Sequence, residues 1–360
     1  MLQDAPESLL LFLFTRNLMR CLMNQLASPE RYLYRIAVTA MKVMVQRVQM
    51  EPSTAVAIIK GLLQPPQGRI NFDQSTKTKT IEKVLSQVNK ASLKQLLPVF
   101  RQLVLNPDAP DGKAASVARQ VLADHLVFIV RLKQGVAEPL DFSAEVQSIL
   151  AMFAEFAYFT VELDALSPEK GLETPVSSAS REMFRSRIST CLTHLFNKSA
   201  DPSYFTYNLV RDVRQREENY KRFKPLLDAD QNVHDSINRA WKTLDKLQSK
   251  EKKAQPNKKQ VLQAFTLLYS LTIIQVYNGD IDAMNVLDEL KDCYASLVKH
   301  RNKGKQKGSE ALVEILLSFV AKPSMMFRRL AQQVFAACAS DVNKSGLQSM
   351  IKVCMCSQDD

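Results

Sequence analysis

The chain has 360 residues, enough for two or three domains or for one extended array of repeats. Hydrophobic residues make up 46% and charged residues 24%, a balance typical of a folded protein and unlike that of a disordered chain. Glycine occurs only nine times, against a usual share of about 7%. This scarcity argues against glycine-rich phosphate loops and tight hairpins, and it favours helices.

The net charge and the cysteines further narrow the class of protein to which the chain can belong. Lys and Arg outnumber Asp and Glu by 48 to 37, a formal net charge of +11 that favours anionic partners. The six cysteines are scattered through apolar stretches, which indicates a reduced, intracellular protein with buried thiols. We find no signal-peptide pattern and no apolar stretch long enough to span a membrane. We therefore expect no membrane partner.

Helical periodicity dominates the chain from end to end. The expected helices cover residues 8–26, 31–50, 53–63, 80–88, 92–105, 114–134, 144–163, 181–196, 203–222, 232–248, 258–277, 281–299, 309–321, 324–339 and 344–355. No segment has the alternating pattern of a strand, so we predict an all-α fold. Two prolines and a glycine mark 167–180 as a linker between N-terminal helical repeats (1–166) and C-terminal helical repeats (181–360).

A short internal sequence repeat indicates that the helices are arranged as repeated pairs. The segments 26–37 and 320–331 match in register, and the shared positions are Ala27 with Ala321, Pro29 with Pro323, Arg35 with Arg329, and Ala37 with Ala331. A proline that ends one helix, followed by a second helix with an outward arginine and a small packed alanine, is typical of HEAT and armadillo repeats. We therefore predict a HEAT/armadillo-like solenoid in which both alanines are buried.

Candidate catalytic residues are few. The string from Tyr277 to Asp282 loosely resembles the metal-binding turn of B-type DNA polymerases, in which carboxylates such as Asp280 and Asp282 would hold two cations. That turn joins two strands, whereas here it lies between helical patterns, so we interpret Gly279 as a helix C-terminal glycine and Asp280 as the next N-cap. The four histidines lie far apart and no phosphate loop is present. We expect neither a cofactor nor a metal site.

Two basic clusters are the strongest functional signal. Both fall in expected loops, 249–260 and 299–309, at the outer ends of one helical hairpin. The candidate nucleic-acid contacts are Lys250, Lys252, Lys253, Lys258, Lys259, Arg301, Lys303, Lys305 and Lys307. Such clusters neutralise phosphates and give salt-sensitive binding without sequence preference. A nuclear-import or protein-docking signal and a merely solvated surface remain alternatives.

Several stretches together resemble one known family. They are FTRNLMRCL (14–22) with SPERYL (28–33), NFD (71–73) with TKTKT (76–80), QVYNGD (275–280) with LDEL (287–290), and EALVEILLSF (310–319) running into Pro323. The chain is similar across nearly its whole length to the DNA polymerase phi and Myb-binding protein family, whose fungal form is often named DNA polymerase V. Members are usually much longer, so the chain resembles a central portion or a shortened form.

The resemblance implies a protein of the nucleus and nucleolus that acts on ribosomal DNA transcription and ribosome assembly. Its implied partners are ribosomal DNA or pre-ribosomal RNA, together with nucleolar and transcription-factor proteins. The family label also implies a DNA polymerase, for which we find no convincing catalytic motif. A DNA polymerase that uses Asp280 and Asp282 and an adaptor that binds only protein therefore remain the alternatives.

Overall fold

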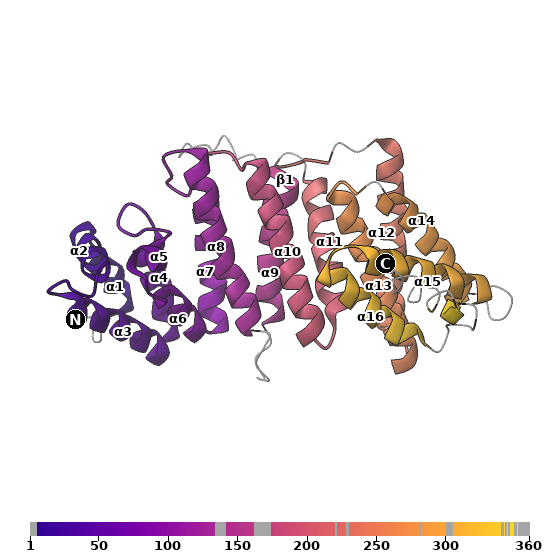
Figure 1. Cartoon of the computed structure of the whole chain (residues 1–360), viewed down its shortest axis with the longest axis horizontal. Coiled ribbons are helices and arrows are strands. Elements are labelled where there is room, and N and C mark those ends of the chain that lie inside the picture. Colours follow the sequence, from indigo (N-terminus) through magenta and orange to yellow (C-terminus); the bar gives the residue numbers. More distant parts are fainter. Residues whose placement is uncertain are drawn as a thin grey trace. The chain divides into compact units, whose positions relative to one another are not determined.

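The computed structural model describes residues 6–133, 142–161, 174–219, 222–227, 230–280, 282–299, 305–339, 342, 344, 346–348 and 351. The chain forms two compact units, which we call unit 1 (Met1–Ala157 and Val161–Ile188) and unit 2 (Tyr158–Thr160 and Ser189–Asp360). Helices dominate both units (Figure 1), so the predicted all-α class is confirmed. The predicted boundary at 167–180 stays a prediction, because residues 167–173 lie outside the described ranges.

Unit 1 is built from helices that follow one another along the chain. They are α1 (Glu7–Leu13), α2 (Arg16–Leu26), α3 (Tyr34–Met50), the 3-10 turn η1 (Pro52–Thr54), α4 (Ala55–Leu63), α5 (Phe72–Thr76), α6 (Thr80–Gln87), α7 (Lys90–Leu105), α8 (Gly112–Lys133), α9 (Ser143–Tyr158) and the first half of α10 (Ser178–Lys198). Helix α8 packs against α6 and α7, and α4 packs against α1, α6 and α7. Each helix buries its apolar stripe against neighbours of this kind.

The first expected helix is in fact two helices, α1 and α2. The Thr15 hydroxyl accepts the backbone N–H of Leu18 at 3.2 Å and caps α2, as serine and threonine do at helix starts. Phe14 is buried at the break and lies against Gly61 of α4, where a Cβ would come within 2.2 Å of the Phe14 ring. The break therefore depends on a tertiary contact that periodicity within residues 8–26 does not reveal.

A buried arginine ties three segments of unit 1 together. Arg119 of α8 is fully buried and donates from Nε to the Val104 carbonyl at 3.0 Å. Its Nη atoms donate to the carbonyls of Pro175 at 3.1 Å and Thr174 at 2.6 Å. Burial lowers the pKa of Arg119. These bonds satisfy a buried charge and fix the end of α7 and the segment ahead of α10 on α8.

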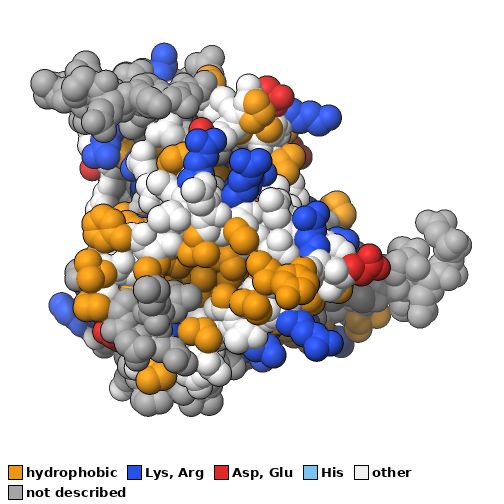
Figure 2. All heavy atoms as spheres, turned by 90° about the vertical axis from the view of Figure 1, so that its left-hand side faces the viewer, with side chains coloured by type: hydrophobic (Ala, Val, Ile, Leu, Met, Phe, Trp, Pro, Cys, Tyr) orange, Lys and Arg blue, Asp and Glu red, His pale blue; other side chains and the backbone are white. Residues whose placement is uncertain are grey.

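Exposed apolar side chains lie on the first three helices of unit 1 and on the segment between α2 and α3. Figure 2 views this part of the chain and shows a patch of hydrophobic side chains bordered by Lys and Arg. The large exposed apolar residues of this region are Leu9, Leu11, Phe12, Leu18, Tyr32, Ile36 and Met50. Apolar exposure on this scale is typical of a surface that another protein segment covers.

Unit 2 is organised around α13 (Pro256–Tyr277). The other elements are the second half of α10, α11 (Pro202–Glu218), α12 (Gln231–Glu251), α14 (Asp282–Tyr294), the π-helical turn η2 (Ala295–Lys299), α15 (Lys305–Ala321) and α16 (Met325–Cys338). Helices α11, α12, α14 and α16 all pack against α13. Every residue from 264 to 277 is buried, so α13 is the core helix of this unit.

The length and composition of α13 correct one expectation from the sequence. Lys258–Tyr277 is apolar enough and long enough to cross a membrane, which we did not expect of any segment. Its most apolar window is 83% buried inside the structure. A helix that is hydrophobic all round is either a membrane span or the centre of a protein core, and this burial indicates the second.

A pair of helices is present at each copy of the internal sequence repeat. Arg35 lies on α3 and Arg329 on α16, and both side chains are exposed. Ala37 and Ala331 are 3% and 4% exposed, as predicted. Pro29 follows α2 and Pro323 follows α15, in each case between the two helices of a pair. The predicted exposure of the arginines and burial of the alanines are confirmed, and the equivalence of the two helix pairs and the solenoid stay predictions.

Other departures from the expected elements are small. Helix α9 ends at Tyr158, and β1 (Phe159–Val161) pairs with β2 (Phe223–Pro225) in a two-stranded sheet, although we expected no strand. The short α5 was missed, and most of the expected helix at 344–355 lies outside the described residues. Of the thiols expected to be buried, Cys21 is exposed on the outer face of α2. Three-residue strands are too short to show a period in the sequence.

His125 gives unit 1 a predictable sensitivity to acid. It lies on α8, and burial lowers its pKa to about 4. An unfolded histidine titrates near 6.5, so the unfolded chain binds more protons between these values. The stability that neutral His125 contributes is therefore complete above pH 6.5 and is lost as the pH falls toward 4.

We expect the parent chain to lose about 2 kcal/mol of stability through His125 between pH 7 and pH 5, and His125→Leu to remove this loss. Thermal unfolding of both proteins at the two pH values measures this difference. His234, which is exposed, provides the control His234→Gln, which should keep the acid sensitivity of the parent chain. Parallel pH profiles for the parent and His125→Leu would contradict the assignment.

Candidate nucleic-acid interface

Helices α12 and α13 form a hairpin whose tip carries the first predicted basic cluster. Only residues 252–255 separate the two helices, so the tip is shorter than the predicted 249–260 loop. Pro256 occupies the first turn of α13, where its missing N–H costs no hydrogen bond. Lys250 and Glu251 have long, unbranched side chains that suit a helix, and α12 continues to Glu251.

Lys250 is held within unit 2. Its Nζ atom donates to the Tyr294 hydroxyl at 3.1 Å and lies 5.5 Å from the centre of the Tyr294 ring. A cation over an aromatic face is attracted by the ring electrons. This contact fixes the α12–α13 tip beside the C-terminal end of α14.

Lys259 is also engaged inside the hairpin. Its Nζ atom lies 3.8 Å from an Oε1 of Glu251, whose side chain is only 11% exposed. Burial raises the pKa of Glu251, and the neighbouring Asp201 raises it further. Gln263 and Gln248 donate to the same carboxylate at 2.9 Å and 3.3 Å. Lys259 therefore helps to balance a partly buried charge.

The remaining three lysines of the cluster are available to a ligand. Lys252, Lys253 and Lys258 are exposed, and within the described part of the chain none of their side chains has a hydrogen bond or an ion pair. Lys252 and Lys253 lie in the tip, and Lys258 lies in the first turn of α13. The tip thus presents three solvated ammonium groups, which can contact phosphates as point charges.

A row of lysines extends this basic surface along α12. Lys242 and Lys246 precede Lys250 at intervals of four residues, which places all three on one face of the helix. Both are exposed and, among the described residues, have no ion-pair partner. Further along the same face Arg239 pairs with Asp288 of α14 at 3.7 Å. The predicted contacts omitted Lys242 and Lys246, although their spacing of four is visible in the sequence.

The second predicted cluster is only partly described. Arg301 and Lys303 lie outside the described residues, and Lys305 and Lys307 belong to the first turn of α15. The chain enters this segment from η2, directly after Tyr294. Lys250 of the first cluster contacts Tyr294. The segment that leads to the second cluster therefore begins next to the first cluster. Whether both clusters face one ligand stays a prediction.

The acidic string at Asp280 and Asp282 is a turn between helices. Gly279 has a φ of 85°, a conformation that glycine adopts without strain, and it follows the end of α13. The Asp280 carboxylate accepts the backbone N–H of Asp282, the first residue of α14, at 3.2 Å. It also accepts Nε2 of Gln275 at 3.2 Å and forms an ion pair with Lys322. The interpretation of this string as a helix–helix turn is confirmed.

The surroundings of this turn do not bring further acidic ligands together. Among the described residues, no group of three or more His, Cys, Asp or Glu side chains is placed to hold a metal ion. Asp280 is committed to a cation of its own chain, Lys322. The Asp280 carboxylate therefore connects the end of α13, the start of α14 and the residue that follows α15.

The fold and the surface define the chain as an all-α protein with a basic helical hairpin. The model of the DNA polymerase phi family matches residues 1–358, and the chain belongs to this family, as the resemblance in the sequence predicts. No solved structure matches the chain at a significant level.

Two yeast proteins are similar over almost the whole chain. One is the rDNA transcriptional regulator pol5 of Schizosaccharomyces pombe, 28% identical over 95% of this chain and 36% of its own length. The other is the rDNA transcriptional regulator POL5 of Saccharomyces cerevisiae, 26% identical over 97% of this chain and 32% of its own length. A Myb-binding protein 1A-like protein of Danio rerio is 27% identical over 31% of this chain and 9% of its own length. The chain thus spans about a third of the yeast relatives.

The role of Asp280 can be tested directly. We expect Asp280→Ala to lower the stability by about 1 to 2 kcal/mol, because it removes an ion pair and two hydrogen bonds that are partly shielded from solvent. Thermal unfolding measures this loss. In a nucleotide-incorporation assay, Asp280→Ala/Asp282→Ala should behave as the parent chain does. Mg²⁺-dependent, template-directed synthesis that the double variant abolishes would overturn the structural assignment.

Proposed function

We propose that the chain is a helical-repeat scaffold that acts in the regulation of rDNA transcription. The observation that carries this proposal is the similarity, over nearly the whole chain, to two proteins named rDNA transcriptional regulators. Because the chain spans about a third of those relatives, the scaffold supplies part of such an activity. The proposal includes a nuclear, nucleolar location and a contribution to ribosome biogenesis.

The ligand of the basic hairpin in this proposal is ribosomal DNA or pre-ribosomal RNA. Lys252, Lys253 and Lys258 are exposed and uncommitted, and Lys242 and Lys246 continue the surface along α12. Lysines that neutralise backbone phosphates release bound counterions, so binding weakens as salt is added. Few aromatic side chains interleave with these lysines, which favours contacts to the backbone over base stacking.

The architecture proposed for the scaffold is a HEAT/armadillo-type solenoid. The pairs α2–α3 and α15–α16 support it, since each has a proline between its helices, an outward arginine and a buried alanine. Stacked helix pairs of this kind expose extended surfaces to several partners. Nucleolar and transcription-factor proteins are the partners proposed for those surfaces.

The exposed lysines give a quantitative test. We expect Lys252→Gln/Lys253→Gln/Lys258→Gln to weaken binding to duplex DNA about equally for all sequences. The slope of log K against log salt should fall by between about 2 and 3, at about 0.9 for each lost phosphate contact. A salt-titrated binding assay on duplex DNA, with RNA of the same length in parallel, measures both quantities and decides between the two ligands.

Lys250 and Lys259 provide the matched control. Both belong to the same tip, yet their ammonium groups are engaged with Tyr294 and Glu251. Lys250→Gln/Lys259→Gln should leave the salt slope close to that of the parent chain and should lower the melting temperature instead. If the triple variant keeps the parent affinity and slope, the nucleic-acid role of the hairpin is wrong, and an adaptor that binds only protein becomes the better account.

A further inference from the structure

Unit 1 contains a cavity of about 450 Å³ that we call the arginine pocket. Its lining consists of Arg16, Arg20 and Arg69 together with Met23, Asn24, Ala27, Pro66, Gln67 and Ser75. No Asp or Glu is among the lining residues. The volume lies within the range of about 300–1,000 Å³ that is usual for ligand sites.

Two segments of unit 1 bring positive charge to this pocket. Arg16 and Arg20 are four residues apart on α2, so they lie on one face of that helix. Arg69 comes from the segment between α4 and α5, and its backbone N–H donates to the Leu62 carbonyl at 2.8 Å. Gly68 makes this close approach possible, because a Cβ there would lie 2.5 Å from the Leu62 carbonyl. The position of Arg69 is therefore fixed by the backbone.

The three arginines of the pocket are uncommitted. Arg16, Arg20 and Arg69 are all exposed, and their side chains have neither an ion pair nor a hydrogen bond within the described part of the chain. Guanidinium groups present planar sets of N–H donors that match a phosphate group in two-point contacts. Asn24, Gln67 and Ser75 add neutral polar side chains to the same walls. The chemistry of this pocket fits a phosphate ester.

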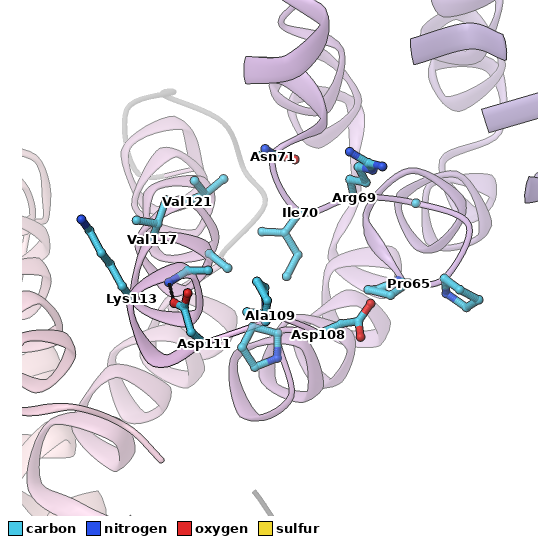
Figure 3. A pocket seen from close by; sticks show the side chains of 16 residues that line it. Pro65, Arg69, Ile70, Asn71, Asp108, Ala109, Asp111, Lys113, Val117 and Val121 are labelled. Carbon is cyan, nitrogen blue, oxygen red and sulfur yellow. Dashed lines mark hydrogen bonds between the residues drawn. The ribbon is translucent and has the colours of Figure 1, made fainter. Parts of the chain in front are cut away.

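A second cavity of about 740 Å³ adjoins the arginine pocket and shares Pro66 and Arg69 with it. Figure 3 shows its two walls, with Ile70 and Pro65 on one side and Val117 of α8 on the other. Pro107 and Pro110 also line it, so its character is largely apolar. We call it the proline pocket.

The proline pocket decides which phosphate-bearing polymer fits. Its lining includes Asp108 and Asp111 beside Arg69 and Lys113, so it has no net positive charge with which to bind the next phosphates of a nucleic-acid backbone. Neither pocket is lined by an aromatic side chain on which a base could stack. A peptide, by contrast, can carry a single phosphate and place an aliphatic or proline residue a few positions away. Arginine clusters beside apolar clefts are a recurrent means of binding phosphorylated peptides.

We propose that unit 1 binds a phosphorylated peptide. The phosphate of a phosphoserine or phosphothreonine contacts Arg16, Arg20 and Arg69, and an apolar residue of the same peptide occupies the proline pocket against Val117. This site is separate from the lysines of unit 2. It makes the chain a reader of phosphorylated protein partners in addition to its proposed role at ribosomal DNA.

The test uses the whole chain and a fluorescein-labelled peptide library with a central phosphothreonine and degenerate flanks. The same library with unmodified threonine and a labelled duplex DNA are measured in parallel by anisotropy. We expect the phosphorylated library to bind at least about tenfold more tightly than the unmodified one, as charge-assisted contacts to phosphate require. Arg16→Gln/Arg20→Gln/Arg69→Gln should abolish that preference.

A matched variant separates the pocket from general charge. Arg31, Arg35 and Lys42 are exposed cations of the same region that do not line the pocket, so Arg31→Gln/Arg35→Gln/Lys42→Gln removes the same charge and should keep the preference. Equal affinity of the parent chain for both libraries overturns the proposal. So does an equal loss in the matched variant. A loss of duplex DNA binding in the pocket variant, with the phosphopeptide preference intact, assigns the arginines to nucleic acid instead.

Val117 tests the peptide part of the proposal. Its side chain is 53% exposed on α8, so Val117→Gln is compatible with the fold. We expect this variant to weaken binding of the phosphorylated library about threefold to tenfold, because an apolar contact is lost. If it binds as the parent chain does, the proline pocket takes no part and the proposal of a peptide ligand is wrong.

Discussion

The burial of α13 is the constraint on which unit 2 depends. Every residue of this helix from 264 to 277 is buried, and four other helices pack against it. Of its buried hydroxyl groups, that of Thr272 donates to the Leu268 carbonyl at 2.7 Å, whereas those of Thr266 and Ser270 have no hydrogen-bond partner among the described residues. A helix so enclosed can meet solvent only at its ends. Its first end carries the basic tip, and its second end carries the Asp280 turn.

Two of the sequence strings that resemble the family connect helices in this structure. At the end of α13, Asp280 links Gln275, Lys322 and the start of α14. In unit 1, the Asp73 carboxylate accepts the backbone N–H groups of Thr80 at 2.9 Å and Ile81 at 3.0 Å and so caps α6. Burial raises the pKa of Asp73 in spite of these bonds. In both strings an aspartate thus holds the start of one helix to a neighbouring segment.

The positive charge of the chain serves two different kinds of surface. In unit 2 the lysines lie at the tip of a helical hairpin, and in our proposal their solvated ammonium groups bind an extended polyanion without sequence preference. In unit 1 the arginines line a cavity, where planar guanidinium groups suit one phosphate at a defined position. Some of the lysines, such as Lys250 and Lys259, are instead used to support their own unit. Net charge alone does not distinguish these three uses.

The sequence by itself determined the helical class, the family, the exposed Arg35 and Arg329 and the helix–helix turn at Gly279, because periodicity, capping and turn residues act over a few neighbouring positions. The tertiary structure decided which basic residues are uncommitted, since Lys250 meets Tyr294 across 44 residues. It also split the first helix at Phe14 against Gly61 and brought Arg69 to Arg16 and Arg20. Those contacts join segments far apart in the chain, and their geometry is set by packing that no local pattern encodes.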